Sequence, residues 1–163
     1  MAAECDVSIR PGWFYHPEED GRVKTVDELT DLYYRSVGHN ATLLLNFPVD
    51  RDGLIHPTDS ANAVNFHKNI QKQLEKNLLA GLSPKASDAR GKAFSAKVLQ
   101  EYIPLGQRVK SFVVEYNQEG EWLPVKLNEE TTTVGYKRLL RFETITTDKL
   151  RVRFTDSRAC LCI

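Results

Sequence analysis

Two different hydrophobic periodicities divide this chain near residue 83. Before that point, apolar residues recur at helical spacing or form one short continuous run, which is typical of alternating strands and helices. After it, apolar and polar residues alternate in short runs between turn residues, which is typical of an antiparallel sheet. We therefore expect an α+β chain in two parts, residues 1–82 and residues 83–163.

The first part carries two predicted helices. Thr25 and Glu28 fit a capping box, in which the Thr hydroxyl and the Glu carboxylate each accept a backbone N–H of the helix start. The apolar residues that follow share one helical face and end near Gly38: Val26, Leu29, Leu32, Tyr33 and Val37. A second helix is predicted from about Thr58 to Gly81, with its own apolar stripe: Ala63, Phe66, Ile70, Leu74 and Leu78.

Two strands are predicted beside these helices. Residues 7–10 end one strand at Pro11-Gly12, and the run Ala41–Phe47 forms another. The second run is almost continuously apolar rather than alternating, which predicts a strand covered on both faces, as in a parallel sheet.

The second part predicts short strands over Ser111–Tyr116, Trp122–Leu127, Thr131–Phe142 and Leu150–Phe154. A hairpin turn is expected at residues 117–121, with the neighbouring Glu115, Glu119 and Glu121 in solvent. In the last strand, Leu150, Val152 and Phe154 are expected to point inward and Arg151 and Arg153 outward. Trp122 and Tyr136 either lie in the core or form an exposed platform for a sugar ring.

Composition excludes several function classes. The 22 basic and 22 acidic residues give a formal net charge of zero, so nucleic acid is not an expected partner. No apolar run approaches the ~18 residues of a spanning helix, and residues 1–10 lack the pattern of a signal peptide. The three cysteines, Cys5, Cys160 and Cys162, lack zinc-ligand spacing and are expected to be unpaired, with no metal bound.

Motifs spread in order along the chain resemble one enzyme family. They are ECDVSIRPGWFYH at 4–16, LYYRSVG at 32–38, LLLNFP at 43–48, DGLIHP at 52–57, QEYIPLGQR at 100–108, VGYKR at 134–138 and DSRAC at 156–160. Together they resemble the α-L-fucosidases of glycoside hydrolase family 29, in the branch selective for α-1,3/1,4-linked fucose.

The resemblance implies a fold and an activity. Residues 1–82 would be the last β/α units of a (β/α)8-type catalytic barrel, and residues 83–163 a partial discoidin-like antiparallel β-sandwich. Between RGKAFSA and LQEYIPLGQ the family carries further sandwich strands, whereas Ala96–Val98 joins these segments directly, which implies an internal deletion. The implied partner is a fucosylated glycan, and the family members are periplasmic or secreted.

No catalytic residue is assigned in this chain. Retaining glycosidases use two carboxyl groups about 5–5.5 Å apart and no metal or other cofactor. The resemblance implies that both the nucleophile and the acid/base precede residue 4. The chain alone is therefore expected to lack hydrolase activity.

The resemblance and the barrel topology favour five substrate-binding candidates. Trp13 matches a family position where an aromatic ring lies against the apolar side of fucose, unless it and Phe14 are core aromatics; for Phe14 the core is favoured. Glu4 and Arg10 either bind sugar hydroxyls or form a structural ion pair. Asn46 ends a strand at the expected carboxyl edge, and His16 either donates to a hydroxyl or is a solvated loop residue.

Three hypotheses follow for the chain as a whole: part of an α-L-fucosidase, a non-catalytic carbohydrate-binding or structural sandwich module, or a non-functional remnant of a longer gene. In each case the unpaired sheet edges of an incomplete barrel predict marginal stability, self-association, or ordering only against a partner.

Overall fold

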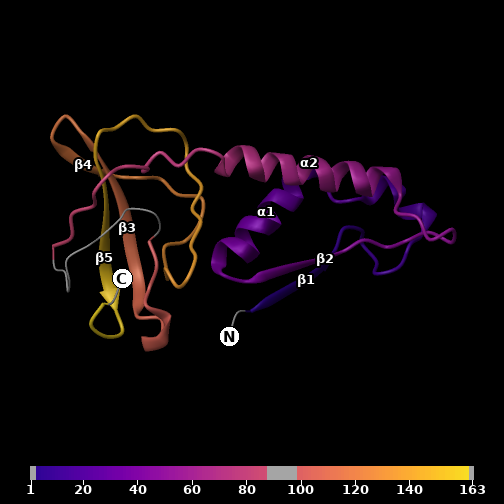
Figure 1. The fold of residues 1–163 in the computed structure, drawn as a ribbon, viewed down its shortest axis with the longest axis horizontal. Helices are drawn as coiled ribbons and strands as arrows, with labels where there is room; N and C mark the ends of the chain where they lie inside the picture. The colour runs from indigo at the N-terminus through magenta and orange to yellow at the C-terminus, as the bar shows by residue number, and fades with distance from the viewer. Residues whose placement is uncertain (1–2, 88–98, 162–163) are drawn as a thin grey trace. The chain divides into compact units, whose positions relative to one another are not determined.

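The computed structural model describes residues 3–87 and 99–161, and these form two compact units (Figure 1). The first unit contains residues 3–37 and 41–87, and the second contains residues 38–40 and 99–161. Ala96–Val98, where the resemblance implies an internal deletion, lies outside the described residues.

The first unit alternates strands and helices. Its elements are β1 (Glu4–Ser8), the 3-10 helix η1 (Pro17–Arg22), α1 (Val26–Ser36), β2 (Thr42–Asn46) and α2 (Pro57–Leu74). The short 3-10 helix η2 (Val37–His39) follows α1, and its last two residues are grouped with the second unit. Strands β1 and β2 pair in parallel, with Glu4 opposite Thr42 and Ser8 opposite Asn46. Because parallel strands end at the same edge of a sheet, the loops that follow Ser8 and Asn46 begin side by side.

Helix α1 begins as predicted. The hydroxyl of Thr25 accepts the backbone N–H of Glu28, and the Glu28 carboxylate accepts the backbone N–H of Thr25 at 2.8 Å. Leu29 and Tyr34 are buried, whereas Tyr33 and Val37 of the predicted stripe are half-buried.

Replacing Thr25 with Ala is expected to lower the free energy of unfolding of the first unit by about 1 kcal/mol, because the start of α1 loses its side-chain acceptor. Thr25→Ser, which keeps the hydroxyl, serves as the control in urea unfolding. An equal loss in both variants would contradict a capping role.

Helix α2 ends at Leu74, earlier than the predicted Gly81. The backbone N–H of Leu79 bonds instead to the side-chain oxygen of Asn77 at 3.0 Å, and Ala80 N–H bonds to the Asn77 carbonyl. Such a local turn replaces the helical hydrogen bonds. Leu78, expected in the buried stripe, is therefore 74% exposed.

The prediction that β2 is covered on both faces is wrong. Leu43 and Leu45 point toward α1 and α2, whereas Leu44 on the opposite face is 52% exposed. Both helices cover one face of a sheet that has only two strands in the described part of the chain, so the other face has no layer over it. Each strand also has one unpaired edge there, and the self-association expected from these edges stays a prediction.

The second unit is built on a three-stranded antiparallel sheet. The short 3-10 helix η3 (Ile103–Leu105) precedes β3 (Val109–Gln118), β4 (Glu121–Pro124) and β5 (Leu150–Ser157), which lie in the order β4-β3-β5. The predicted hairpin is confirmed: Glu119 and Gly120 both have positive φ, 53° and 95°, as in the tight turns that join twisted strands.

The predicted strand over Thr131–Phe142 is absent from the described structure except for one isolated bridge between Leu127 and Phe142. Gly135 interrupts it with a φ of +61°, and its N–H points at the carboxylate of Glu101 rather than at a neighbouring strand.

Glu101 organises three segments around the start of β3. Its buried carboxylate accepts the backbone N–H groups of Val109 at 2.8 Å, Gly135 at 2.6 Å and Arg108. Burial by itself raises the pKa of this carboxyl group, but the backbone donors outweigh burial and hold the pKa below its ordinary value. Glu101 is therefore a fixed negative charge inside the second unit.

The core of the second unit lies on one face of this sheet. Val109, Phe112 and Val134 are buried together, and Phe154 packs against them, as predicted for the last strand. Leu150 and Val152, predicted to point inward as well, are 48% and 36% exposed. They share the face of Phe154 but lie farther along β5, beyond these buried residues.

Three further predictions concern exposure and cysteines. Tyr136 is 55% exposed, so the core alternative fails for it, while Trp122 is half-buried. Cys5 and Cys160 are free, and Cys162 lies outside the described residues. In residues 3–87 and 99–161, none of the helices has the length and apolar character needed to cross a bilayer.

Candidate substrate-binding site

The loop after β1 is fastened to the end of β2. Asn46 donates from Nδ2 to the Trp13 carbonyl at 3.0 Å and to the Ser8 hydroxyl at 3.2 Å. Ser8 in turn donates to the Gly12 carbonyl at 2.7 Å. These bonds hold the backbone of the loop at the carboxyl edge of the two parallel strands.

Trp13 and Phe14 are both exposed, by 50% and 78%. The core prediction for Phe14 is therefore wrong, because the loop backbone rather than its side chains is held against the sheet. The indole of Trp13 offers apolar area with one N–H at its rim, a surface that suits one face of a sugar ring.

Arg10 also anchors this loop, through its buried side chain. Its guanidinium is fully buried and forms a two-point ion pair with Asp59 at the start of α2: Nε lies 2.8 Å from Oδ2 and Nη2 lies 2.9 Å from Oδ1. Its Nη1 donates to Asp20 at 2.9 Å and to the carbonyl of His16 at 3.4 Å. The hydrogen bond with Asp59 raises the pKa of Arg10 even though burial opposes that shift, so the guanidinium stays charged.

Arg10 forms a buried structural ion pair, but with Asp59 and not with Glu4. Glu4 is the first residue of β1 and is exposed, whereas Arg10 lies two residues beyond Ser8, the last residue of that strand. The structure therefore brings together Trp13, Asn46, Arg10 and His16, and leaves Glu4 at the opposite end of β1.

A second layer of polar and aromatic groups surrounds Arg10. The Tyr15 ring lies under the guanidinium, 4.7 Å from centroid to Cζ, and its hydroxyl donates to Asp20 at 3.5 Å. Burial, followed by the charge of Asp20, raises the pKa of Tyr15, so its hydroxyl stays protonated. His56 lies 3.5 Å from Asp20 and accepts the Thr58 N–H at the start of α2. His16 itself is exposed and precedes η1.

Sequence reasoning missed Asp59, Asp20 and His56 as parts of this network. A signal for Asp59 was present, because Asp59, Ala63, Phe66 and Ile70 recur at helical spacing. An acid in line with an apolar stripe predicts a buried carboxylate, which needs a buried cation.

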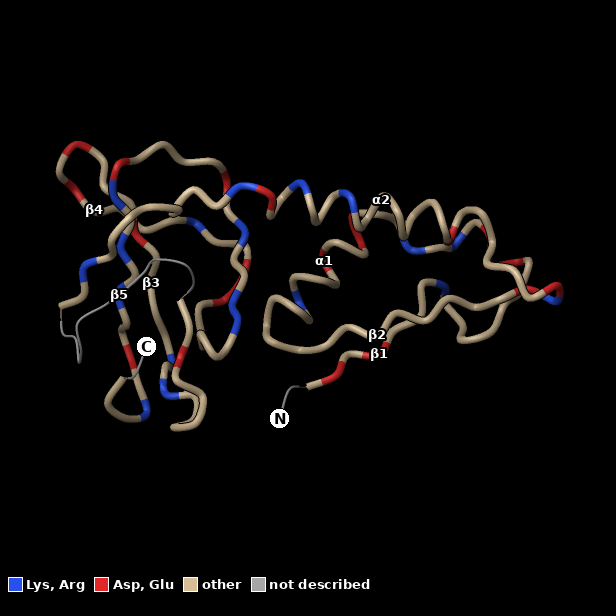
Figure 2. Tube along the Cα trace, viewed as in Figure 1, with Lys and Arg blue, Asp and Glu red and all other residues tan. Residues whose placement is uncertain are grey.

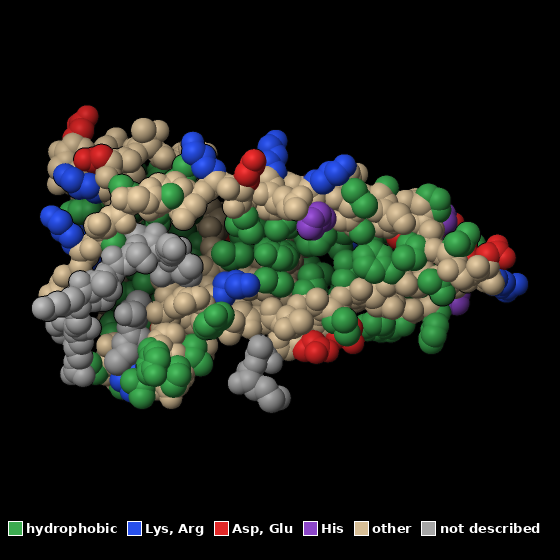
Figure 3. Space-filling view, in the orientation of Figure 1, with side chains coloured by type: hydrophobic (Ala, Val, Ile, Leu, Met, Phe, Trp, Pro, Cys, Tyr) green, Lys and Arg blue, Asp and Glu red, His purple; other side chains and the backbone are tan. Residues whose placement is uncertain are grey.

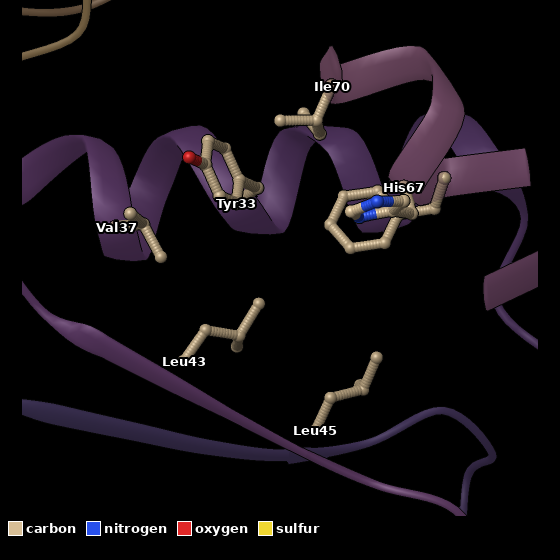
Figure 4. Close-up of a pocket in the computed structure, with 7 residues that line it drawn as sticks. Tyr33, Val37, Leu43, Leu45, His67 and Ile70 are labelled. Atoms are coloured by element: carbon tan, nitrogen blue, oxygen red, sulfur yellow. The ribbon is translucent and has the colours of Figure 1, made fainter. Parts of the chain in front are cut away.

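A hollow of about 270 Å³ lies between α1, α2 and the face of β2 that these helices cover. Its lining is mostly apolar and is shown in Figure 4: Tyr33, Val37, Leu43, Leu45, Phe66, His67 and Ile70. Figure 3 shows hydrophobic side chains gathered between α2 and the strands. This hollow lies on the helix side of the sheet, away from the carboxyl edge that carries Trp13. Among the described residues, no group of three or more His, Cys, Asp or Glu is placed to hold a metal ion.

Comparison with known proteins shows which sequences and structures this chain is similar to. No family model matches the chain. α-L-Fucosidase 1 of Arabidopsis thaliana is 33% identical over 87% of this chain and 35% of its own length. A solved Bacteroides thetaiotaomicron structure that bears the α-L-fucosidase name is 36% identical over 98% of this chain and 42% of its own, with a TM-score of 0.84. A family 29 fucosidase of Ruminococcus gnavus, solved in complex with fucose, is 28% identical over 95% of this chain and 38% of its own, with a TM-score of 0.73.

These similarities make the chain a relative of the glycoside hydrolases. Within that class it belongs to family 29, the α-L-fucosidases, and it spans about two fifths of its relatives' length or less. The aligned stretch with the Arabidopsis protein covers 182 positions, more than the 163 residues of the chain, so that relative carries residues within the stretch that have no counterpart here.

Proposed function

We propose that this chain supplies one wall of the fucose pocket of a retaining α-L-fucosidase. The first unit would be the last β/α units of a (β/α)8-type catalytic barrel, and the second a discoidin-like sandwich. The observation that carries the proposal is the exposed Trp13, held by Asn46 at the carboxyl edge of two parallel strands, because barrel enzymes build their sites at that edge. The fucose complex of the Ruminococcus relative supports the same ligand.

Each candidate then has a distinct role. Trp13 would lie against the apolar side and methyl group of a terminal α-L-fucose, and His16 would reach a hydroxyl from the same loop. Asn46 and Arg10 would act by positioning, because their side chains hold the loop backbone and Asp59. Glu4 lies away from this edge, and we propose no sugar contact for it.

The catalytic carboxyl groups would belong to the part of such an enzyme that this chain does not span. We propose that the whole enzyme releases terminal fucose in α-1,3 or α-1,4 linkage, and that this chain alone does not. The motifs at 4–16, 32–38 and 100–108 support this branch of the family.

Titration of the chain with L-fucose, followed by NMR, tests the pocket wall. Trp13→Ala is expected to weaken binding about tenfold or more, because the sugar loses its apolar contact. Phe14→Ala, at the adjacent exposed aromatic residue, is the matched control and is expected to change affinity less than about twofold.

Two results would count against the proposal. Equal losses in both variants would show that the loop rather than Trp13 matters. Turnover of a chromogenic α-L-fucoside by the isolated chain would show that it does contain the catalytic carboxyl groups.

A further inference from the structure

The outer face of the β4-β3-β5 sheet carries an array of charged and aromatic side chains. Residues alternate between the two faces of a strand, so Glu115 on β3 faces away from the core residue Phe112. Arg151 and Arg153 on β5 lie opposite Glu115 and Val113, and Trp122 on β4 lies opposite Asn117. Glu115, Arg151, Arg153 and Trp122 therefore share one face. Figure 2 shows the basic residues along β5.

Glu115 holds the two guanidinium groups. Its Oε2 accepts Nε of Arg151 at 2.7 Å, and its Oε1 accepts Nη2 of Arg153 at 3.3 Å. Glu115 is only 6% exposed, so the expectation of a solvated hairpin end is wrong for it. The hydrogen bond from Arg151, assisted by Arg153, lowers the pKa of Glu115, which keeps the carboxylate charged.

The indole ring of Trp122 stacks against the guanidinium group of Arg151. The Cζ atom of Arg151 lies 4.2 Å from the centroid of the indole ring, a stacking contact that orients the guanidinium plane. One face of the indole ring is thus covered by the cation.

The array has an excess of positive charge and of hydrogen-bond donors. Each guanidinium carries five N–H donors, and within the described residues Glu115 uses one of each group. The Arg151 and Arg153 side chains remain 41% and 54% exposed, so these remaining donors reach solvent. One carboxylate against two cations leaves a net positive site whose geometry is already set, which lowers the entropic cost of binding an anion.

We propose that this array binds a sulfated glycan. A sulfate ester presents three terminal oxygens, enough to bridge both guanidinium forks, and Arg groups recognise such planar or tetrahedral oxyanions through paired N–H bonds. The proposal concerns the second unit and does not depend on the fucose pocket of the first. Single-stranded nucleic acid is disfavoured because Arg151 covers one face of the Trp122 ring, which leaves less aromatic surface for a base to stack on.

Calorimetric titration of the full chain with a heparin-derived tetrasaccharide tests this site. Arg153→Gln is expected to weaken binding about tenfold, because an anion loses one charged fork. Arg153→Lys keeps the charge but not the fork, and is expected to bind at least about threefold more weakly than the native chain. Lys110→Gln, on the same sheet and with the same loss of charge, is the matched control and should change affinity less than about twofold.

Several outcomes would overturn the proposal. They are equal losses in Arg153→Gln and Lys110→Gln, undiminished binding of the desulfated tetrasaccharide, equal affinity for a short single-stranded DNA, or no binding by the native chain. Trp13→Ala should leave tetrasaccharide binding unchanged, so failure of this site and failure of the fucose pocket are distinguishable. A thermal melt of each Arg153 variant confirms folding, and the exposure of that side chain makes a large change in stability unexpected.

Discussion

Asp59→Asn is expected to lower the free energy of unfolding of the first unit by about 3–5 kcal/mol. The substitution leaves Arg10 with a fully buried guanidinium and removes the charge that its Nε and Nη2 face. Asp20 remains as a partner, but its side chain is 36% exposed and bonds only Nη1. Leaving a buried cation without its principal carboxylate lowers the free energy of unfolding much more than breaking an exposed ion pair does.

Urea unfolding followed by Trp13 fluorescence in a Trp122→Phe background measures this loss. Asp31→Asn breaks the exposed pair of Asp31 with Arg35 and is the control, with an expected change below about 0.5 kcal/mol. The structural assignment of Arg10 fails if Asp59→Asn unfolds at the same urea concentration as the control. Loss of fucose binding in Asp59→Asn at temperatures where it stays folded is also expected, because the loop that carries Trp13 would lose its anchor.

Glu101→Gln is expected to destabilise the second unit by about 2–3 kcal/mol. The amide keeps one carbonyl oxygen, but it turns an NH2 group toward backbone N–H donors that now face the carboxylate. The expected result is that η3, the start of β3 and the Gly135 segment separate from one another.

The same residue makes the second unit sensitive to acid. The folded pKa of Glu101 lies below its value in the unfolded chain, about 4.3 for a glutamate. The carboxylate therefore contributes its full stability above that unfolded value, and the contribution is lost as the pH falls through the lowered folded pKa.

Melting curves between pH 7 and pH 3, followed by Trp122 fluorescence in a Trp13→Phe background, measure both effects. Between pH 5 and pH 3 the native chain should lose more stability than Glu101→Gln, in which this group no longer titrates. Glu143→Gln, at an exposed position, should behave as the native chain does. Identical acid slopes in the native chain and Glu101→Gln would refute the role of Glu101.

Local signals in the sequence predicted the local structure well. The capping box of Thr25 with Glu28 and the hairpin around Gly120 depend on residues a few positions apart, and both are confirmed. The predicted strand over Thr131–Phe142 fails because Glu101, far away in the sequence, captures the N–H of Gly135. Alternation of apolar residues alone does not reveal such a distant acceptor.

In the candidate site, too, only the features that depend on residues close together in the sequence were predictable. The position of Asn46 at the end of β2 follows from the apolar run before it. The partner of Arg10 does not follow from the run around residue 10, because Asp59 is distant in sequence and comes from a helix start. Phe14 is exposed because Asn46 and Ser8 bind backbone carbonyl groups of the loop rather than packing against its side chains. The sequence around Phe14 does not reveal these hydrogen bonds.

The pairing of β5 has a consequence for the order in which the second unit assembles. Strands β3 and β4 meet through a tight turn, and such hairpins close within about 1–10 μs. Strand β5 pairs with β3 across a long intervening segment, with Leu150 opposite Tyr116 and Ser157 opposite Val109. Closing that loop costs chain entropy before any contact repays it. We therefore expect the β3–β4 hairpin to form first and β5 to pair with it afterwards, so that the arginines of β5 reach Glu115 late in folding.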